Sequence, residues 1–141
     1  NINKKRILIL SKEFGFKIQS LDKNWDEITI ILTDHENMIS LNSKYFKKKT
    51  TTDVISFTYN PIPGEKQLLG GDIVINLDMV MEEGKKRNNV NFELAFYIAH
   101  GFDHLSGYDD NTPLKRKKMH DREKKWIEQA DQHNLLDNLI A

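Results

Sequence analysis

The stretch from Glu93 to Asp110, ELAFYIAHGFDHLSGYDD, constrains the fold of this 141-residue chain more than any other. Its apolar residues recur at helical spacing and form one stripe, which predicts a helix packed against a core: Leu94, Ala95, Ile98, Phe102 and Leu105. Gly107 follows the last of them. Because glycine adopts a left-handed backbone without strain, we expect the helix to end just before it.

Two histidines lie on this predicted helix. Residues four apart share one face of a helix, so His100 and His104 can reach a single cation. The reversal at Gly107 brings Asp110 or, as a competing candidate, Asp109 back toward them. We predict a metal site made of His100, His104 and Asp110 with one open position, as in catalytic zinc sites with three protein ligands and a water. Nitrogen and oxygen ligands also suit other divalent metals.

Apolar runs and turn residues predict the other elements. Three strands are expected at residues 28–32, 54–57 and 68–77, with a bulge or a close backbone approach at Gly70 and Gly71. Helices are expected within residues 2–14, with Gly15 as the stop, and at 35–46 after an Asp34 cap. A third helix is expected to begin at Asp78, and a fourth to run from an Asn91 cap through the histidines. The last is expected to run from a Thr112 cap to about residue 131. Residues 60–64 have the composition of a hairpin loop, and the tail after residue 131 either extends the last helix or frays.

Composition fits one folded unit. Hydrophobic residues make up 38% and charged residues 30% of the chain, which is ordinary for a globular protein and excludes a disordered one. There are no cysteines, so disulfides and thiolate ligands are excluded, and we expect a cytoplasmic protein without a membrane partner. We predict a single compact α+β domain over residues 1–141, with a small mixed sheet of three to four strands, about five helices, and the metal site at the end of a core helix.

The segment HGFDHLSGYDD resembles the signature of the YbeY-type endoribonucleases, HGxLHLxGYDH, in which three histidines hold a zinc. A second segment, LNSKYFKKKTTTDVISF at residues 41–57, is similar to the family's LNxxYRxKDxPTDVLSF, and GGDIVIN follows it as GDIVIS does in the family. Met119 and Glu123 keep the spacing of a C-terminal M-x-x-x-E. The resemblance covers most of residues 34–127, in motifs of the expected order and spacing.

Three positions depart from the family pattern. Asp110 stands where the family has its third histidine, and one carboxylate in place of an imidazole is expected to make the bound ion a weaker Lewis acid. Asp103 replaces a leucine. Phe46 replaces an arginine that the family is thought to use on its substrate, so a neighbouring lysine would have to contact the phosphate, without arginine's bidentate fork.

The resemblance implies a zinc-dependent endoribonuclease specific for single-stranded RNA, with one ion per chain and a water activated by it, acting in ribosomal RNA maturation and ribosome quality control. We assign His100 and His104 as catalytic. Predicted substrate contacts are Lys47, Lys48, Ser56 and Lys115, since basic runs can form a rim for an RNA backbone. The resemblance also implies a short strand before the first helix, and the chain begins with Asn1 instead of methionine.

Two other functions remain open on the residues alone. The first is a non-catalytic RNA- or ribosome-binding factor whose metal is structural, which the altered third ligand and the absent arginine favour. The second, weaker alternative is a zinc metalloprotease, because a histidine pair with a third ligand after a glycine turn also occurs there. Those enzymes need a glutamate directly after the first histidine as general base, and Gly101 occupies that position.

Overall fold

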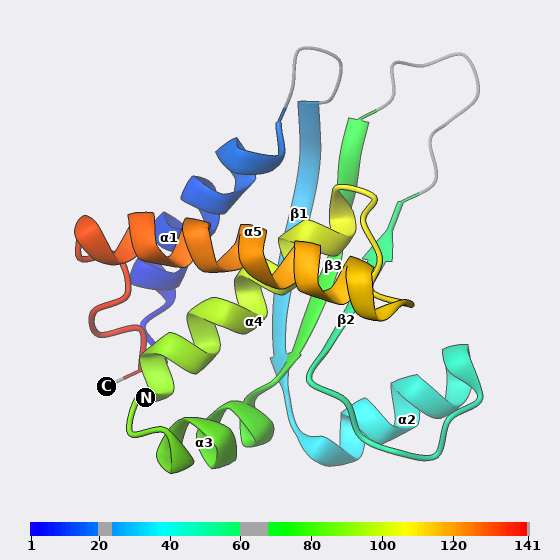
Figure 1. Ribbon diagram of the computed structural model, residues 1–141. Helices are drawn as coiled ribbons and strands as arrows, with labels where there is room; N and C mark the ends of the chain where they lie inside the picture. The colour runs from blue at the N-terminus through cyan, green and yellow to red at the C-terminus, as the bar shows by residue number, and fades with distance from the viewer. Residues whose placement is uncertain (20–23, 60–67, 141) are drawn as a thin grey trace.

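The computed structural model describes residues 1–19, 24–59 and 68–140, and within them the chain forms five helices and a three-stranded sheet (Figure 1). The elements in chain order are α1 (Lys4–Ile18), β1 (Asn24–Thr33), α2 (His35–Phe46), β2 (Val54–Thr58), β3 (Leu68–Asn76), α3 (Leu77–Lys86), α4 (Val90–Leu105) and α5 (Pro113–Gln132). The predicted α+β class, the helix count and the small sheet are confirmed.

The sheet has the strand order β1-β3-β2 and is mixed, as predicted. β1 runs parallel to β3, and β2 runs antiparallel to β3. Side chains alternate between the two faces of β3: Ile73 and Ile75 belong to the main core, while Val74 packs with Met38 of α2 and Ile55 of β2. α2 therefore packs through Met38 on one face of the sheet, and the main core lies on the other.

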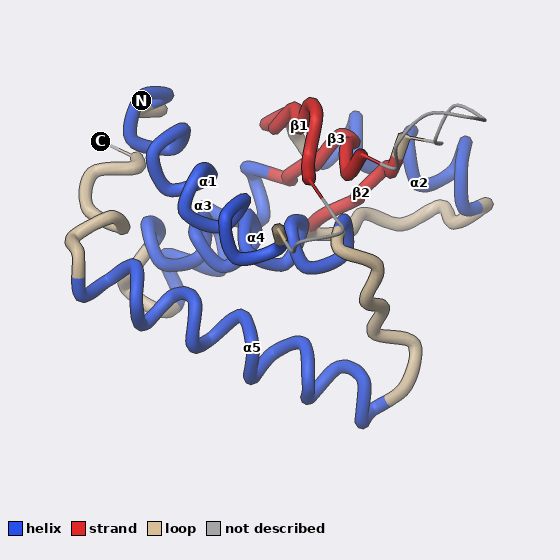
Figure 2. The backbone as a smooth tube through the Cα atoms, turned by 90° about the horizontal axis from the view of Figure 1, so that it is seen from above, coloured by secondary structure: helices blue, strands red, loops and turns tan. Residues whose placement is uncertain are grey.

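α4 is the central helix of the main core. It contacts β2 and β3 on one side and α1, α3 and α5 on the others. Figure 2 shows the resulting layers, with the sheet, then α4, then α5 as the outermost helix. The apolar stripe predicted for this helix is buried throughout: Leu94, Ala95, Ile98, Phe102 and Leu105. Burial of this stripe on several elements fixes the rotation of α4, and so fixes which side its histidines face.

Two glycines allow the sheet and α4 to approach closely. A Cβ atom at Gly101 would lie 2.3 Å from Cγ2 of the buried Ile73, and one at Gly71 would lie 2.8 Å from Cδ2 of Leu105 in α4 and 2.1 Å from the Phe57 carbonyl oxygen of β2. The close approach predicted for the Gly70–Gly71 pair is thus confirmed. The register irregularity lies on the partner strand, between Trp25 and Ile28 of β1.

Several predicted boundaries are wrong. The first helix does not stop at Gly15, which is buried inside α1, because Ile18 in the last turn also packs into the core. The cap of α4 is Asn89, whose side chain accepts from the Phe92 N–H at 3.0 Å, while the Asn91 side chain accepts from the Ile140 N–H at 2.8 Å. α3 begins at Leu77 after an Asn76 cap, one residue before Asp78. The caps at Asp34 and Thr112 are confirmed.

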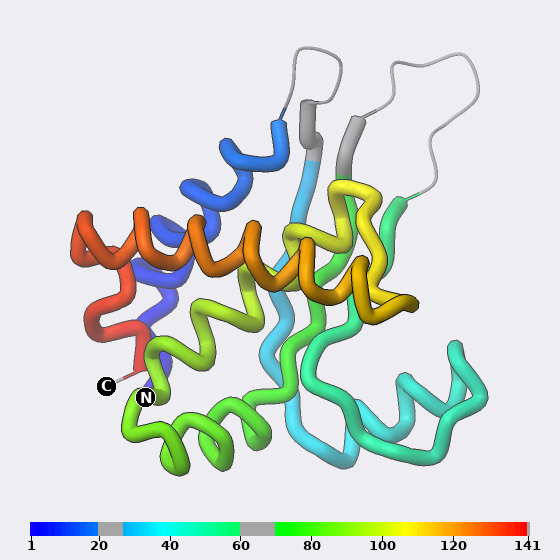
Figure 3. Tube along the Cα trace, in the orientation of Figure 1, coloured from blue at the N-terminus to red at the C-terminus, as the bar shows by residue number. Residues whose placement is uncertain are grey.

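The tail neither continues α5 nor frays. After Gln132 the chain turns back, and Leu136 and Leu139 are buried in the core. The Asn3 N–H donates to the Leu139 carbonyl at 2.9 Å, so the two ends of the described chain lie side by side (Figure 3). Ile2 makes a single bridge with Ile140, and no strand precedes α1 among the residues described. The predicted hairpin loop at 60–64 lies outside them. None of the described helices has the length and apolarity that a bilayer crossing requires.

Candidate metal centre

The C-terminal half of α4 carries both histidines. Gly101 lies against Ile73 of β3, and His100 and His104, four residues apart, share a face of the helix beside the one that packs on the sheet. The helix ends at Leu105, and Gly107 has a φ of +106°, which confirms the predicted glycine turn. This reversal returns residues 108–110 toward the imidazoles.

Three ligand atoms converge at this point. Nε2 of His100 and Nε2 of His104 lie 3.0 Å apart. Oδ2 of Asp110 lies 3.6 Å from Nε2 of His100 and 3.8 Å from Nε2 of His104. Tetrahedral zinc, with metal–nitrogen distances of about 2.0–2.1 Å, holds its ligand atoms about 3.3–3.5 Å apart. The group formed by His100, His104 and Asp110 could therefore hold one metal ion.

Each histidine is oriented by a hydrogen bond at its other nitrogen. Nδ1–H of His104 donates to the Tyr108 carbonyl at 3.0 Å, and Nδ1–H of His100 donates to Oε1 of Glu123 at 2.7 Å. Because carbonyl and carboxylate oxygens accept, each of these bonds holds a proton on Nδ1 and directs Nε2 toward the point that the two rings share. The two Nε2 atoms lie 3.0 Å apart, so one cation can contact both. The donor set fits a divalent metal.

The surroundings of His100 favour positive charge. Burial is the largest single influence on its pKa and lowers it, but the hydrogen bond to Glu123 and the charges of Glu123, Asp53 and Asp110 outweigh burial, so the pKa is raised overall. A bound cation would satisfy the same electrostatic preference.

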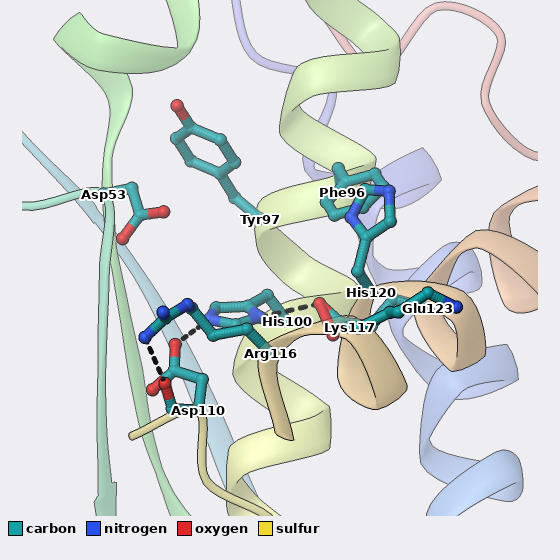
Figure 4. Close-up of a pocket in the computed structure, with 9 residues that line it drawn as sticks. All are labelled: Asp53, Phe96, Tyr97, His100, Asp110, Arg116, Lys117, His120 and Glu123. Atoms are coloured by element: carbon teal, nitrogen blue, oxygen red, sulfur yellow. Dashed lines mark hydrogen bonds and ion pairs between the residues drawn. The ribbon is translucent and has the colours of Figure 1, made fainter. Parts of the chain in front are cut away.

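The competing ligand, Asp109, points elsewhere. Its Oδ1 lies 3.3 Å from Nζ of Lys115, and the same oxygen accepts from the Asn111 N–H at 3.5 Å. Asp110 is the acid that faces the histidines (Figure 4).

Behind His100, two buried acids lie next to each other. Asp103 of α4 accepts from Nε and Nη2 of Arg122 at 2.8 and 3.0 Å. Burial and the neighbouring Glu123 carboxylate nevertheless raise the pKa of Asp103 to about 7. Among the described residues, the buried Oε2 of Glu123 has no hydrogen-bond partner.

Arg122 joins this network to the glycine turn. Its guanidinium carbon lies 3.9 Å from the centre of the Tyr108 ring, a cation–π contact. The carbonyl of Tyr108 orients His104, and Asp110 is two residues further on. One side chain of α5 thus contacts both α4, through Asp103, and the turn that carries the third ligand.

The metal group opens onto a cleft of about 460 Å³ (Figure 4). It is lined by residues of α4 and α5, by the residue before β2 and by one from the segment between α4 and α5: Asp53, Phe96, Tyr97, His100, Asp110, Arg116, Lys117, His120 and Glu123. Nη1 of Arg116 donates to the Asp110 carbonyl at 3.2 Å, which places the guanidinium beside the ligand group. Burial, and then the Glu93 carboxylate, raise the pKa of Tyr97, so its hydroxyl keeps its proton.

None of the four predicted substrate-binding residues is among those that line this cleft. Oγ of Ser56 donates to the Gly101 carbonyl at 3.1 Å, next to His100. Lys115 pairs with Asp109. Lys47 and Lys48 are exposed at the end of α2, beyond the edge strand β2. Ser56 and Lys115 thus lie close to the metal group. Lys47 and Lys48, which follow α2, lie farther along the surface.

Sequence reasoning missed several residues of the site. Glu123 was noted only for its spacing from Met119 in the family's C-terminal motif, and its contact with His100 was not predicted. A lone acid within the apolar stripe of α5 is nevertheless a signal that the acid has a buried partner. Arg116 and Lys117 belong to a run of basic residues, and the sequence does not show toward which side of α5 each of them points. His120 lines the cleft and packs on Phe96 at 5.1 Å between ring centres.

Comparison with known proteins decides the family. The sequence model of the family described as Endoribonuclease YbeY matches residues 4–131, nearly the whole chain. The chain belongs to the YbeY endoribonuclease family. The motifs at residues 41–57 and 100–110 lie within the matched range, so the resemblance carried by the sequence is confirmed.

Individual YbeY relatives agree. An Endoribonuclease YbeY of an Anaeromyxobacter species (strain Fw109-5) is 39% identical over 94 residues, covering 66% of this chain and 48% of the relative. Those of Fusobacterium nucleatum and Coxiella burnetii are 38% and 36% identical, covering 68% and 80% of this chain and 62% and 75% of the relatives. The chain thus spans about half to three-fifths of the length of the first two.

One solved structure has the same overall fold as this chain. The solution structure of TM1509 from Thermotoga maritima has a TM-score of 0.62 over 99% of this chain and 90% of that one, at 21% sequence identity. This similarity concerns the fold alone.

Proposed function

We propose that this chain is a zinc-dependent endoribonuclease that cleaves single-stranded RNA with a water activated by the metal. The observation that carries the proposal is the convergence of His100, His104 and Asp110 on one point beside a cleft with cationic side chains. The name Endoribonuclease YbeY, shared by the matching relatives, supports a phosphodiester substrate.

The metal, held by Nε2 of both histidines and by Asp110, would supply Lewis acidity and a water of lowered pKa. The chain's own residues prepare that position. Glu123 and the Tyr108 carbonyl fix which nitrogen of each imidazole is a ligand. The Asp110 carboxylate adds the one negative charge among the three ligands.

Arg116 is the side chain best placed to bind the scissile phosphate. It uses Nη1 on the Asp110 carbonyl, and a guanidinium has further N–H groups in the same plane for a phosphate. It would thereby provide, from α5, the bidentate cation that Phe46 removes from α2. Lys47, Lys48, Ser56 and Lys115 stay as proposed contacts of the flanking RNA, where backbone binding carries no sequence information.

The metalloprotease alternative has a steric difficulty. A glutamate at position 101 would need a Cβ where Ile73 Cγ2 lies 2.3 Å away, and that position faces the sheet, away from the cleft. Glu123, the other acid that contacts His100 besides Asp110, is hydrogen-bonded to Nδ1 of that histidine. A glutamate directly after the first histidine, the general base of those proteases, therefore does not fit here.

The cellular role follows only from the family resemblance. We propose that the chain acts in the cytoplasm on ribosomal RNA, in its maturation and in ribosome quality control, with the ribosome or a ribosome-associated protein as partner. A non-catalytic RNA-binding factor with a structural metal is the alternative that an experiment must separate from this.

Single-turnover cleavage of an end-labelled single-stranded RNA tests the proposal. Zinc content is measured on the same preparations of the wild type, His104→Ala and Asp109→Ala. We expect bound zinc and cleavage in the wild type, loss of both in His104→Ala and on chelation, and retention of both in the matched control Asp109→Ala. RNA binding with no cleavage under zinc, manganese, cobalt or nickel would refute the nuclease and favour the binding factor.

A further inference from the structure

Three aromatic side chains form a cluster at the end of α2 and on the edge strand β2. Tyr45 meets Phe57 edge-on at 5.0 Å between ring centres, and Phe46 stacks on Phe57 at 6.3 Å with an interplanar angle of 22°. Phe57 packs against Met38, Ile55 and Val74, so the cluster is anchored on the sheet. We call Tyr45, Phe46 and Phe57 the aromatic cluster.

The two outer rings of the aromatic cluster remain exposed. Tyr45 is 53% and Phe46 50% accessible, although both are large rings in a folded α+β unit. Their inner sides contact Phe57, which limits the orientations they can take. Two adjacent, half-exposed rings held against a third form a contiguous exposed apolar patch, and patches of this kind are where proteins bind partners or ligands.

The surroundings of the aromatic cluster are strongly basic. Lys44, Lys47, Lys48 and Lys49 are all exposed, and the sequence has no acid between Glu36 and Asp53. Nζ of Lys44 lies 5.2 Å from the centre of the Tyr45 ring. Lysine is depleted at protein–protein interfaces, whereas aromatic rings among cations are the pattern of single-stranded nucleic-acid sites.

The aromatic cluster lies across one strand from the metal group. Neighbouring residues of β2 point to opposite faces, so Ser56 faces α4 and donates to the Gly101 carbonyl, while Phe57 faces α2. Figure 1 shows β2 at the open edge of the sheet, between α2 and the segment that joins α4 to α5. A strand of RNA that crosses this edge can contact the metal cleft and the aromatic cluster together.

We propose that the aromatic cluster is a stacking platform for unpaired bases of single-stranded RNA, with Lys47 to Lys49 holding the phosphates beside it. This inference rests on the proposed function and specifies its substrate. Stacking tolerates any base, because every base has a π face, but a duplex keeps its bases stacked on each other and cannot use the platform. The platform thus gives a physical reason for a preference for single strands.

The test is equilibrium binding of a fluorescent 12-nucleotide uridine RNA to the metal-free His104→Ala protein, so that cleavage does not enter. A second RNA has abasic sites at its central positions and keeps every phosphate. In that background we compare Phe46→Ala, Phe46→Leu and Lys47→Gly. Phe46→Leu keeps apolar contact with Phe57 but has no ring. Lys47 has a φ of +55°, which glycine accepts, so Lys47→Gly removes a charge without straining the turn.

We expect Phe46→Ala and Phe46→Leu each to weaken binding of the uridine RNA by about 5- to 140-fold, the range for one base on one aromatic side chain. Neither should change binding of the abasic RNA, which should already be weaker in the parent protein. Lys47→Gly should weaken both RNAs alike and make the dependence on salt shallower. Circular dichroism checks that each variant is folded.

Equal affinity of the parent protein for the two RNAs would overturn the inference, and so would wild-type affinity in folded Phe46→Leu. Unchanged RNA binding by Phe46→Ala, together with loss of binding to vesicles containing phosphatidylserine, would overturn it in favour of a lipid surface. These outcomes are independent of the proposed function: a protein that never cleaves can still show the platform, and a nuclease can lack it.

Discussion

The Asp103–Arg122 pair is a quantitative test of how the metal centre is supported. Asp103 is 0% exposed and Arg122 keeps 28% of its side chain accessible, and the two make a bidentate contact at 2.8 and 3.0 Å. Removing one partner of a buried pair costs about 3–5 kcal/mol, because the other charge is left without compensation. For Arg122→Met we expect the lower end, about 3 kcal/mol, since Arg122 is partly solvated and Asp103 can take up a proton.

The reverse single change should cost less. In Asp103→Leu the arginine loses its partner but can turn toward water, so we expect a loss of about 1 kcal/mol. The double variant removes both charges, and an apolar pair of similar volume is often neutral relative to the ion pair. We therefore expect the double variant to lose about 1 kcal/mol relative to the wild type, which makes it about 2 kcal/mol more stable than Arg122→Met alone. If the two losses were additive, the double variant would instead lose roughly 4 kcal/mol.

Urea unfolding monitored by circular dichroism measures the free energy of unfolding of all four proteins. Chelator is present throughout, so that metal binding does not add to the stability of the folded state. With a slope of about 2 kcal/mol per molar urea, a loss of 3 kcal/mol lowers the midpoint by about 1.5 M. Losses that add within about 0.5 kcal/mol would refute the reasoning, because the two side chains would then not depend on each other.

Two further predictions concern the same helix pair. Glu123→Gln keeps the shape of the side chain but weakens the hydrogen bond to Nδ1 of His100, so zinc affinity should fall about 10- to 100-fold. Competition with a chromogenic chelator measures this affinity, and an unchanged value would mean that Glu123 does not orient the ligand. Gly101→Ala places a methyl group 2.3 Å from Ile73 Cγ2 and should lower the free energy of unfolding by about 1–3 kcal/mol, whereas a loss below 0.5 kcal/mol in urea unfolding would contradict the close packing of α4 on β3.

Much of the fold could be predicted because its signals are local. The stripe of α4 and the turn at Gly107 are encoded within sixteen consecutive residues, and both are confirmed. The wrong boundaries have non-local causes. Asn89 and Asn91 have the same capping chemistry, and the choice between them depends on the tail, which uses Asn91 for the Ile140 N–H. The cost of about 1 kcal/mol for glycine inside a helix did not end α1 at Gly15, because Ile18 gains burial in the core.

The candidate site divides in the same way. Spacing within one helix and one turn was enough to propose His100, His104 and Asp110, and these are the three groups that converge. Glu123 and Arg116 could not be placed, because their role depends on how α5 lies across α4. The sequence shows that α5 is amphipathic and does not show which partner its face meets.

α5 adds two functional side chains to the histidine pair, and their spacing along the helix explains how both reach the site. Arg116 and Glu123 are seven residues apart, about two helical turns, so the residue in the cleft and the residue behind His100 lie on one side of the helix. Met119 and Ile127 on the same helix are buried. The burial that stabilises α5 therefore also sets the positions of the polar groups. A substitution that rotated this helix would move the His100 acceptor and the cleft guanidinium together, so loss of metal affinity and loss of phosphate binding should accompany each other.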